Sequence, residues 1–178
     1  MKLTEIKSPA EIKTLSVEEL EGVAKEIREA LLTKLSRRGG HIGPNLGMVE
    51  ASIAMHYVFD LPKDKIIYDV SHQSYVHKML TGRMEAFIDP EHYGDVTGYT
   101  NPKESPTDLF TIGHTSTAVS LAGGLVKARE LRGGDEKIIA VVGDGSLSGG
   151  EAFEGLDFAA ATGTPVVATA DAVVEVAE

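Results

Sequence analysis

The chain has 178 residues, with 17 Lys and Arg against 27 Asp and Glu, and a formal net charge of −10 at pH 7. This acidic balance argues against nucleic-acid binding. The absence of cysteine excludes disulfides, thiol catalysis and zinc–cysteine sites. The first residues lack the apolar core of a signal peptide, and no apolar run is long enough to span a membrane. We therefore expect a cytoplasmic protein that contacts neither membrane nor nucleic acid, with a length that suits one domain (1–178).

The first half of the chain reads as mostly helical. Ser16-Val-Glu-Glu19 is a capping box, and apolar residues then recur at helical spacing from Leu20 to Leu35. Gly39-Gly40 ends this helix. A loop carrying His41 follows, and residues 48–59 form the next predicted helix.

Strands and helices alternate in the rest of the chain. Predicted strands cover 65–70, 137–142 and 165–170, and predicted helices cover 71–80, 113–131 and 150–161. Residues 83–112 read as a long loop, of the kind that tends to be functional. This order predicts an α/β fold with a parallel sheet flanked by helices. Because such a short sheet exposes an apolar edge and face, we also expect association, most simply as a homo-oligomer.

The most informative stretch is Ile138 to Gly150, an apolar run that stops at Gly143-Asp144-Gly145. The glycines allow backbone to approach a ligand, and turn N–H groups before a helix favour a phosphate. Asp144 repels a bare phosphate, so its position points to a bridging cation such as Mg²⁺. The turn is neither a P-loop nor a dinucleotide fingerprint, since Ser148 replaces the third glycine. An ordinary strand-to-helix turn stays open as an alternative.

Three of the six histidines, His41, His72 and His114, stand at loop or strand ends beside Gly or Ser. His72 and Asp144 each follow a predicted strand, at the carboxyl ends where such sheets bind ligands. His72 and His77 are five residues apart and do not share a helix face as a metal pair would.

The other polar residues receive simpler interpretations. His56 lies in an apolar helix and reads as a core or interface residue, whereas His77 and His92 read as surface residues. Ser116 and Thr117, near a helix start, could cap the following helix or bind a diphosphate, and capping is the expectation that we favour. Arg83 and Asn101 are open candidates for a substrate phosphate.

Several separated motifs together resemble one family. They are His41-Ile-Gly-Pro-Asn-Leu-Gly47, Tyr68-Asp-Val-Ser-His-Gln73, Gly113-His-Thr-Ser-Thr117 and Gly143-Asp-Gly145, supported by Leu80-Thr-Gly-Arg83 and Gly98-Tyr-Thr-Asn-Pro102. In order and approximate spacing they resemble the 1-deoxy-D-xylulose-5-phosphate synthases, a family of transketolase-like thiamine diphosphate enzymes. The resemblance runs from about residue 14 to 160 and covers the first part of a much longer family member.

The resemblance implies a transketolase-like, diphosphate-binding (PP-type) domain that uses thiamine diphosphate and Mg²⁺. The implied transferase reaction joins pyruvate, with decarboxylation, to glyceraldehyde 3-phosphate, and its product feeds isoprenoid and thiamine biosynthesis. It implies that His41, His72 and His114 serve substrate and proton transfer, and that Asp144 binds the metal. The residues implied to bind the cofactor are His72, His114, Thr115, Ser116, Gly143, Asp144, Gly145 and Ser146.

The chain also departs from the family pattern. The family's second metal ligand is an asparagine, and an ungapped count places Val173 there, with Asp171 two residues earlier. The pyrimidine-binding domain that activates the cofactor lies beyond the matched part, so we expect this chain alone to be inactive. Two further hypotheses stay open. One is a non-catalytic or partner-requiring fragment, and the other is a dinucleotide-binding module with Asp171 as its ribose-binding acid. The motifs favour decarboxylative condensation over ketol transfer without excluding the latter.

Overall fold

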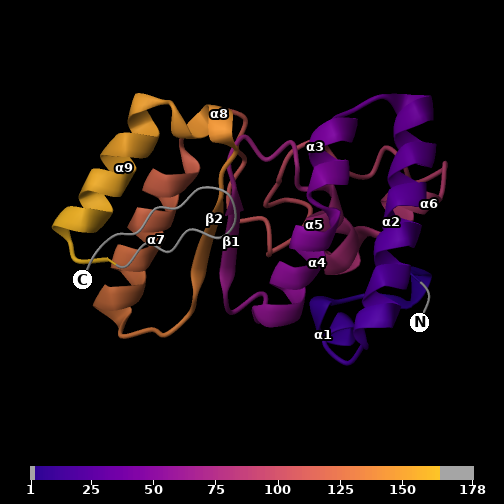
Figure 1. Cartoon of the computed structure of the whole chain (residues 1–178), viewed down its shortest axis with the longest axis horizontal. Coiled ribbons are helices and arrows are strands. Elements are labelled where there is room, and N and C mark those ends of the chain that lie inside the picture. The colour runs from indigo at the N-terminus through magenta and orange to yellow at the C-terminus, as the bar shows by residue number, and fades with distance from the viewer. Residues whose placement is uncertain (1–2, 165–178) are drawn as a thin grey trace.

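The computed structural model describes residues 3–164 of the chain (Figure 1). Its elements, in chain order, are η1 (Leu3–Glu5), α1 (Pro9–Ile12), α2 (Val17–Arg38), α3 (Ile42–Gly47), α4 (Val49–Val58), β1 (Lys65–Tyr68), α5 (Tyr75–Lys78), the π-helical η2 (Met79–Arg83), α6 (Glu85–Ile88), α7 (Ala118–Arg132), β2 (Ile138–Val141), α8 (Asp144–Leu147) and α9 (Gly150–Ala161).

The long helix α2 begins and ends as the sequence predicts. The backbone N–H of Glu19 donates to Ser16 Oγ at 3.3 Å, and the N–H of Ser16 donates to the Glu19 carboxylate at 2.9 Å. This reciprocal capping box satisfies two N–H groups that a helix start leaves without intrahelical acceptors. At the other end Gly39 has a φ of 73°, which favours glycine and stops the helix.

The sheet consists, within residues 3–164, of β1 and β2 paired in parallel. Lys65 lies opposite Ile138 and Tyr68 opposite Val141, and the N–H of Asp69 extends the ladder to the carbonyl of Val141 at 2.8 Å. The predicted strands 65–70 and 137–142 are confirmed in slightly shorter form. The predicted strand 165–170 lies outside the described residues.

Helices lie on both sides of this strand pair (Figure 1). On one side α7 packs against β1 and β2, with α9 beyond it. On the other side the Tyr68 ring of β1 meets the His77 ring of α5, with their centroids 5.3 Å apart. The larger apolar core lies among α2, α4, α5, η2 and α6, and a smaller one lies between α7 and the strands. Parallel pairing between helical layers confirms an α/β class, although the chain is richer in helix than in strand.

The predicted starts of two helices were wrong, because left-handed residues precede the helices in the structure. The helix predicted for 71–80 begins only at Tyr75, because Val70 and Ser71 have φ values of 58° and 68°. The helix predicted for 113–131 begins at Ala118, after Ser116 with a φ of 70°. Left-handed residues cannot continue a right-handed helix.

Short helices also occupy two segments predicted as loop. Helix α3 follows His41 directly, and α6 begins the segment 83–112. A third short helix, α8, contains Asp144 and Gly145 of the glycine turn and precedes the predicted helix α9. Single-turn helices carry too few apolar positions to show a helical period.

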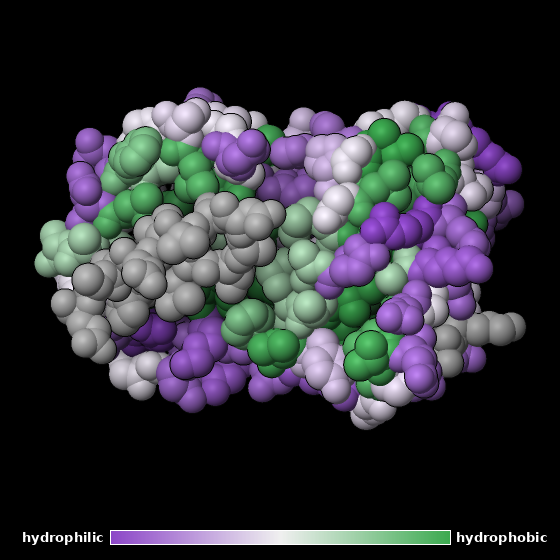
Figure 2. Space-filling model, viewed as in Figure 1, coloured by the Kyte–Doolittle hydropathy of each residue, from purple (hydrophilic) through white to green (hydrophobic). Residues whose placement is uncertain are grey.

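The surface carries exposed apolar side chains in several places. Figure 2 shows hydrophobic side chains reaching the surface beside α9 and along α2 and α4. Val17, Val58 and Phe153 are each more than half exposed. None of the helices within 3–164 is both long and apolar enough to cross a membrane.

Candidate functional site

The carboxyl ends of β1 and β2 place the starts of two predicted site segments at one edge of the sheet. Because Tyr68 pairs with Val141, and the Asp69 N–H donates to the Val141 carbonyl, Asp69–His72 and Val142–Asp144 leave the strands at the same edge. This is the edge where parallel sheets bind ligands. In the sequence, His72 and Gly143 are some seventy residues apart.

Asp69 holds the start of α7 at this edge. Its buried carboxylate accepts the backbone N–H groups of Ser116 and Thr117 at 2.9 Å each and that of Ala118 at 3.0 Å. The expectation that Ser116 or Thr117 caps α7 was therefore wrong, because a carboxylate from another strand occupies the cap position. Since Asp69 already satisfies these donors, the N-terminus of α7 has little left to offer a diphosphate.

Ser116 ties this helix start to the glycine turn. Its buried Oγ donates to the carbonyl of Ser146 at 2.6 Å, and a Cβ at Gly149 would overlap the Ser116 hydroxyl. Its side chain therefore positions the turn. Its neighbours His114 and Thr115 are exposed, and His114 Nδ1 lies 2.7 Å from the Thr115 carbonyl oxygen.

The turn itself offers a carboxylate and open space. Asp144 is exposed, and a Cβ at Gly143 or Gly145 would meet nothing within 4 Å. Ser146 is buried behind them. Asp144 opens α8, whose first N–H groups have no intrahelical acceptor. This donor set fits a diphosphate held through a cation.

A metal at Asp144 would need most of its ligands from elsewhere. Residues 3–164 contain no cluster of three or more His, Cys, Asp or Glu side chains that could hold a metal ion. Mg²⁺ accepts this arrangement, because it commonly uses one or two carboxylates and completes its octahedron with phosphate oxygens and water. Val173, at the expected second-ligand position, and Asp171, on which the dinucleotide hypothesis rests, lie outside the described residues.

The rings of His41, before α3, and His72, in the loop after β1, lie side by side. Their ring centroids lie 5.3 Å apart in an edge-on arrangement, and the Tyr99 ring lies 5.5 Å from that of His41. His41 Nδ1 is 3.3 Å from the hydroxyl of Tyr75. Burial, and then the neighbouring His41, lower the pKa of His72 from its ordinary value. A neutral His72 at pH 7 can accept a proton, and its Nδ1 has no hydrogen-bond partner among the described residues.

Asn45 connects the two histidine loops. Its fully buried side-chain amide donates to the carbonyl of His41 at 2.7 Å and to that of His72 at 2.8 Å. Its Oδ1 accepts the backbone N–H of Tyr75 at 2.9 Å. One side chain thereby fixes the spacing of His41 and His72 and the start of α5. Sequence reasoning assigned Asn45 no role, although an asparagine among glycines is a residue type suited to bridging backbone.

A buried polar network lies beneath these loops. His56 Nδ1 is 2.7 Å from the Ser52 carbonyl oxygen, His56 Nε2 is 2.9 Å from His77 Nδ1, and His77 Nε2 is 3.1 Å from Asp108 Oδ1. His56 is a satisfied core residue, as predicted. His77 is 1% exposed, so the prediction that it is a surface residue was wrong. The half-exposed His92 agrees with its prediction and pairs with Asp95.

The same network engages Arg83, one of the two phosphate candidates. Both terminal nitrogens of its guanidinium donate to Asp108 at 2.8 Å, and one also lies 3.3 Å from Glu104. Burial alone would raise the pKa of Asp108, but hydrogen bonds from His77 and Arg83 hold it well below its usual range. The other candidate, Asn101, donates its backbone N–H to Asp108 and accepts from the N–H of Lys103. The terminal nitrogens of Arg83 are therefore already paired with carboxylates, whereas the side-chain amide group of Asn101 stays a candidate for a substrate phosphate.

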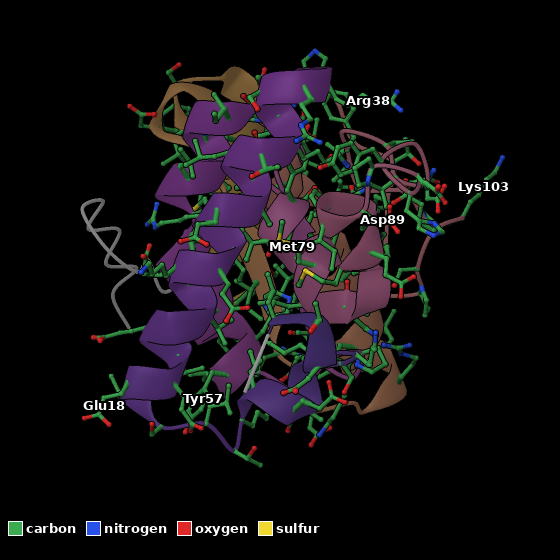
Figure 3. The ribbon with its side chains drawn as sticks, turned by 90° about the vertical axis from the view of Figure 1, so that its right-hand side faces the viewer. Glu18, Arg38, Tyr57, Met79, Asp89 and Lys103 are labelled. Atoms are coloured by element: carbon green, nitrogen blue, oxygen red, sulfur yellow. The ribbon has the colours of Figure 1, made fainter. Side chains whose placement is uncertain are left out.

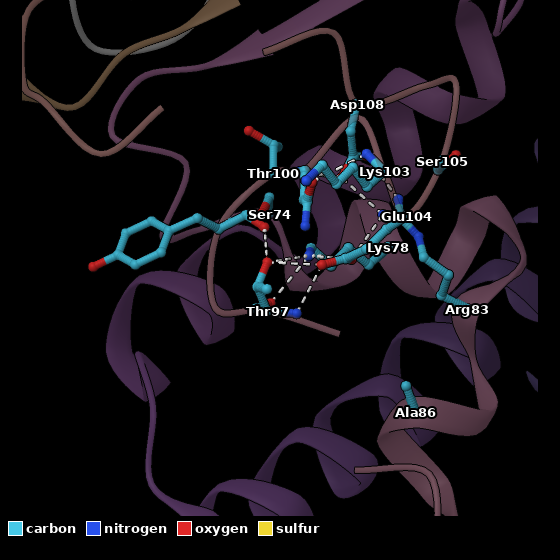
Figure 4. Close-up of polar contacts among 12 residues, drawn as sticks. Ser74, Lys78, Arg83, Ala86, Thr97, Thr100, Lys103, Glu104, Ser105 and Asp108 are labelled. Atoms are coloured by element: carbon cyan, nitrogen blue, oxygen red, sulfur yellow. Dashed lines mark hydrogen bonds and ion pairs between the residues drawn. The ribbon is translucent and has the colours of Figure 1, made fainter. Parts of the chain in front are cut away.

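Lys78 completes the support of the long loop. Its buried Nζ lies 2.6 Å from Glu104 and donates to the Thr97 carbonyl at 3.0 Å, as Figure 4 shows. Glu104 in turn accepts the N–H and hydroxyl of Thr97. These charged hydrogen bonds hold the segment 97–108 in place, with the Tyr99 ring next to the His41 ring. Spacing in the sequence gives no signal for these partners.

Comparisons with known proteins agree with the motifs. The chain matches the family model described as 1-deoxy-D-xylulose-5-phosphate synthase over residues 3–172. The 1-deoxy-D-xylulose-5-phosphate synthase of Symbiobacterium thermophilum is 48% identical over 94% of this chain and 26% of that protein. Those of Dictyoglomus turgidum and Listeria welshimeri are 49% and 51% identical, each over 88% of this chain and 25% of the relative. The chain therefore spans about a quarter of the length of these relatives.

Proposed function

The chain belongs to the 1-deoxy-D-xylulose-5-phosphate synthase family, as an N-terminal part of such a protein, and from this membership we propose that it forms the thiamine diphosphate-binding half of the active site. The observation that carries the proposal is that the His72 and Gly143–Ser146 segments follow two paired parallel strands and leave them at the same edge of the sheet. We assign the whole chain to a single PP-type domain with a transketolase-like fold.

Asp144 and the turn around it hold the diphosphate in this proposal. Asp144 binds Mg²⁺, and the N–H groups of Gly145 and Ser146 donate to phosphate oxygens in the open space above Gly143. Ser116 keeps this turn in place through its hydrogen bond to the Ser146 carbonyl. The exposed His114 and Thr115 line the neighbouring loop, where they contact the cofactor.

His41 and His72 act on the substrates. Thiamine diphosphate, when bound, supplies the carbon–carbon chemistry, and the protein orients the reacting groups. The low pKa of His72 keeps its imidazole neutral, so that one ring nitrogen accepts a proton while the other donates. His41, 5.3 Å from His72, binds a substrate oxygen or takes up the same proton, and His114 takes part from its own loop.

The reaction that we propose for the assembled enzyme is the condensation of pyruvate, with decarboxylation, and glyceraldehyde 3-phosphate. The pyrimidine end of the cofactor needs a second domain, which another part of the protein or a partner chain would contribute. We propose that this chain binds cofactor but does not turn over alone.

Calorimetric titration of thiamine diphosphate, with and without Mg²⁺, tests the site. We expect binding that requires Mg²⁺ and that weakens at least about tenfold in Asp144→Ala, because the metal loses its protein carboxylate. Asp157→Ala, which removes an exposed carboxylate from α9, is the matched control and should bind like the original chain. Binding that ignores Mg²⁺, or that survives in Asp144→Ala, would overturn the assignment.

A further inference from the structure

A cavity of about 280 Å³ lies beside His41, between the end of α2 and the loop before Tyr99. Lys34, Phe87 and Tyr93 contribute buried wall, and the exposed Arg38 stands at the rim. Figure 3 shows Arg38 at the end of α2, on the side of the molecule that carries the loop after α6. The cavity volume is several times the roughly 30 Å³ of a water molecule, so it can hold a small organic molecule.

The cavity brings two cations together without an acidic partner. Lys34 Nζ donates to the carbonyl of Ala86 at 2.7 Å and lies 4.1 Å from the centroid of the Phe87 ring. Neither Lys34 nor Arg38 forms an ion pair within the part of the chain that the structure describes. A buried ammonium with one carbonyl acceptor retains two N–H donors, which favour an anion.

We propose that this cavity binds a small oxyanion, held by the Lys34 ammonium and the Arg38 guanidinium beside His41. The shared chemistry is that of a phosphate ester or a carboxylate, since both accept several charge-assisted hydrogen bonds. Given the proposed function, the anion belongs to a substrate whose carbon chain extends toward His41. The binding site itself uses none of the groups assigned to the metal or the diphosphate.

The pKa of Lys34 reports directly on anion binding in the cavity. Burial first, then Lys78 and Arg38, lower the pKa of Lys34 to about 8, while the more distant Glu104 and Asp95 raise it. A bound anion adds a negative charge beside the ammonium and stabilises its protonated form. Occupation of the cavity should therefore raise the pKa of Lys34, which NMR of labelled lysine can follow.

The test is a titration of the full chain with inorganic phosphate and, separately, with acetate, without thiamine diphosphate or Mg²⁺. We expect saturable shifts of the Gly40 and His41 amide signals and a rise in the pKa of Lys34. Saturation by phosphate alone identifies a phosphorylated substrate, and saturation by acetate identifies a carboxylate; either result supports the site.

Variants distinguish specific anion binding in the cavity from non-specific attraction to positive charge on the surface. Arg38→Ala should weaken binding by about tenfold, because one charge-assisted contact is lost, whereas the exposed neighbour Arg37→Ala should change it less than about twofold. Lys34→Met keeps the aliphatic stem over Phe87 and should weaken binding as strongly as Arg38→Ala. Equal effects of the two arginine variants, or no saturable response to either anion, would overturn the proposal. The Mg²⁺-dependent titration at Asp144 is independent of this result.

Discussion

At the scale of single residues, several groups inside the family motifs position the site, although the sequence assigned them no positioning role. Asp69 immobilises the start of α7, Ser116 fixes the glycine turn, and Asn45 spans the two histidine loops. Each of these side chains hydrogen-bonds to backbone groups of another segment, so the pattern of residue types in the sequence does not reveal its partner. The residues that carry chemistry were found from their neighbours in sequence, whereas those that hold them in place were not.

Asn45 offers a sharp test of positioning. Asn45→Ala leaves two buried carbonyls and the N–H of Tyr75 without partners, so we expect a loss of about 2–4 kcal/mol in the free energy of unfolding. Urea denaturation measures this loss. Asn101→Ala, which removes one exposed hydrogen bond to Lys103, should cost less than about 1 kcal/mol. In folded Asn45→Ala, NMR titration should show the pKa of His72 returning toward its ordinary value as its loop loosens; an unchanged pKa would contradict the positioning role.

At the scale of elements, the packing of α4 against α5 depends on a histidine pair. His56 on α4 contacts His77 on α5, and His77 in turn contacts Asp108 on the long loop. Burial is the main reason that the pKa of His56 is lowered to about 3. Burial is also the main reason that the pKa of His77 is lowered. Burial therefore favours the neutral form of both side chains in the folded protein near pH 7.

This pair predicts a pH-dependent stability. Between an ordinary histidine pKa of 6.5 and the folded value of about 3, the unfolded chain binds a proton at His56 that the folded chain does not. Stability is therefore full above pH 6.5 and falls as the pH decreases, with a limiting slope of about 1.4 kcal/mol per pH unit for this one group. Urea denaturation between pH 7 and 5 checks it.

His56→Gln supplies the comparison for this slope. It removes the titrating group while keeping a side chain that can bond to the Ser52 carbonyl, so the slope should become shallower. The surface variant His92→Gln should leave the slope nearly unchanged. Identical slopes in the original chain and His56→Gln would show that other groups carry the acid sensitivity.

At the scale of the whole molecule, apolar surface remains uncovered. An open groove of about 680 Å³ lies between α2 and α4, lined by apolar residues such as Leu20 and Ile53, and the exposed Val17 and Val58 belong to it. Phe153 and Phe158 add apolar surface on α9. Contiguous apolar area of this kind marks interaction surfaces more often than free surface.

We therefore expect the chain to associate with itself or with a partner. Light scattering over a range of concentrations should give a mass above that of the monomer, and Val17→Ser combined with Val58→Ser should lower it if the α2–α4 groove is the contact. Leu131→Ser, at an exposed position near the end of α7, is the control. A single monomeric species at high concentration would count against this prediction.

The sequence by itself determined the family, the strands β1 and β2, and the placement of His72 and Asp144 after those strands. These follow from local patterns, because a short apolar run, a glycine turn and a capping box act over a few residues. Only the tertiary structure decided that His77 is buried, that Asp69 caps α7, that Arg83 is paired and that Asn45 joins His41 to His72. Those contacts link segments up to about fifty residues apart, so they depend on which elements pack together, and that choice is made by the burial of the whole core.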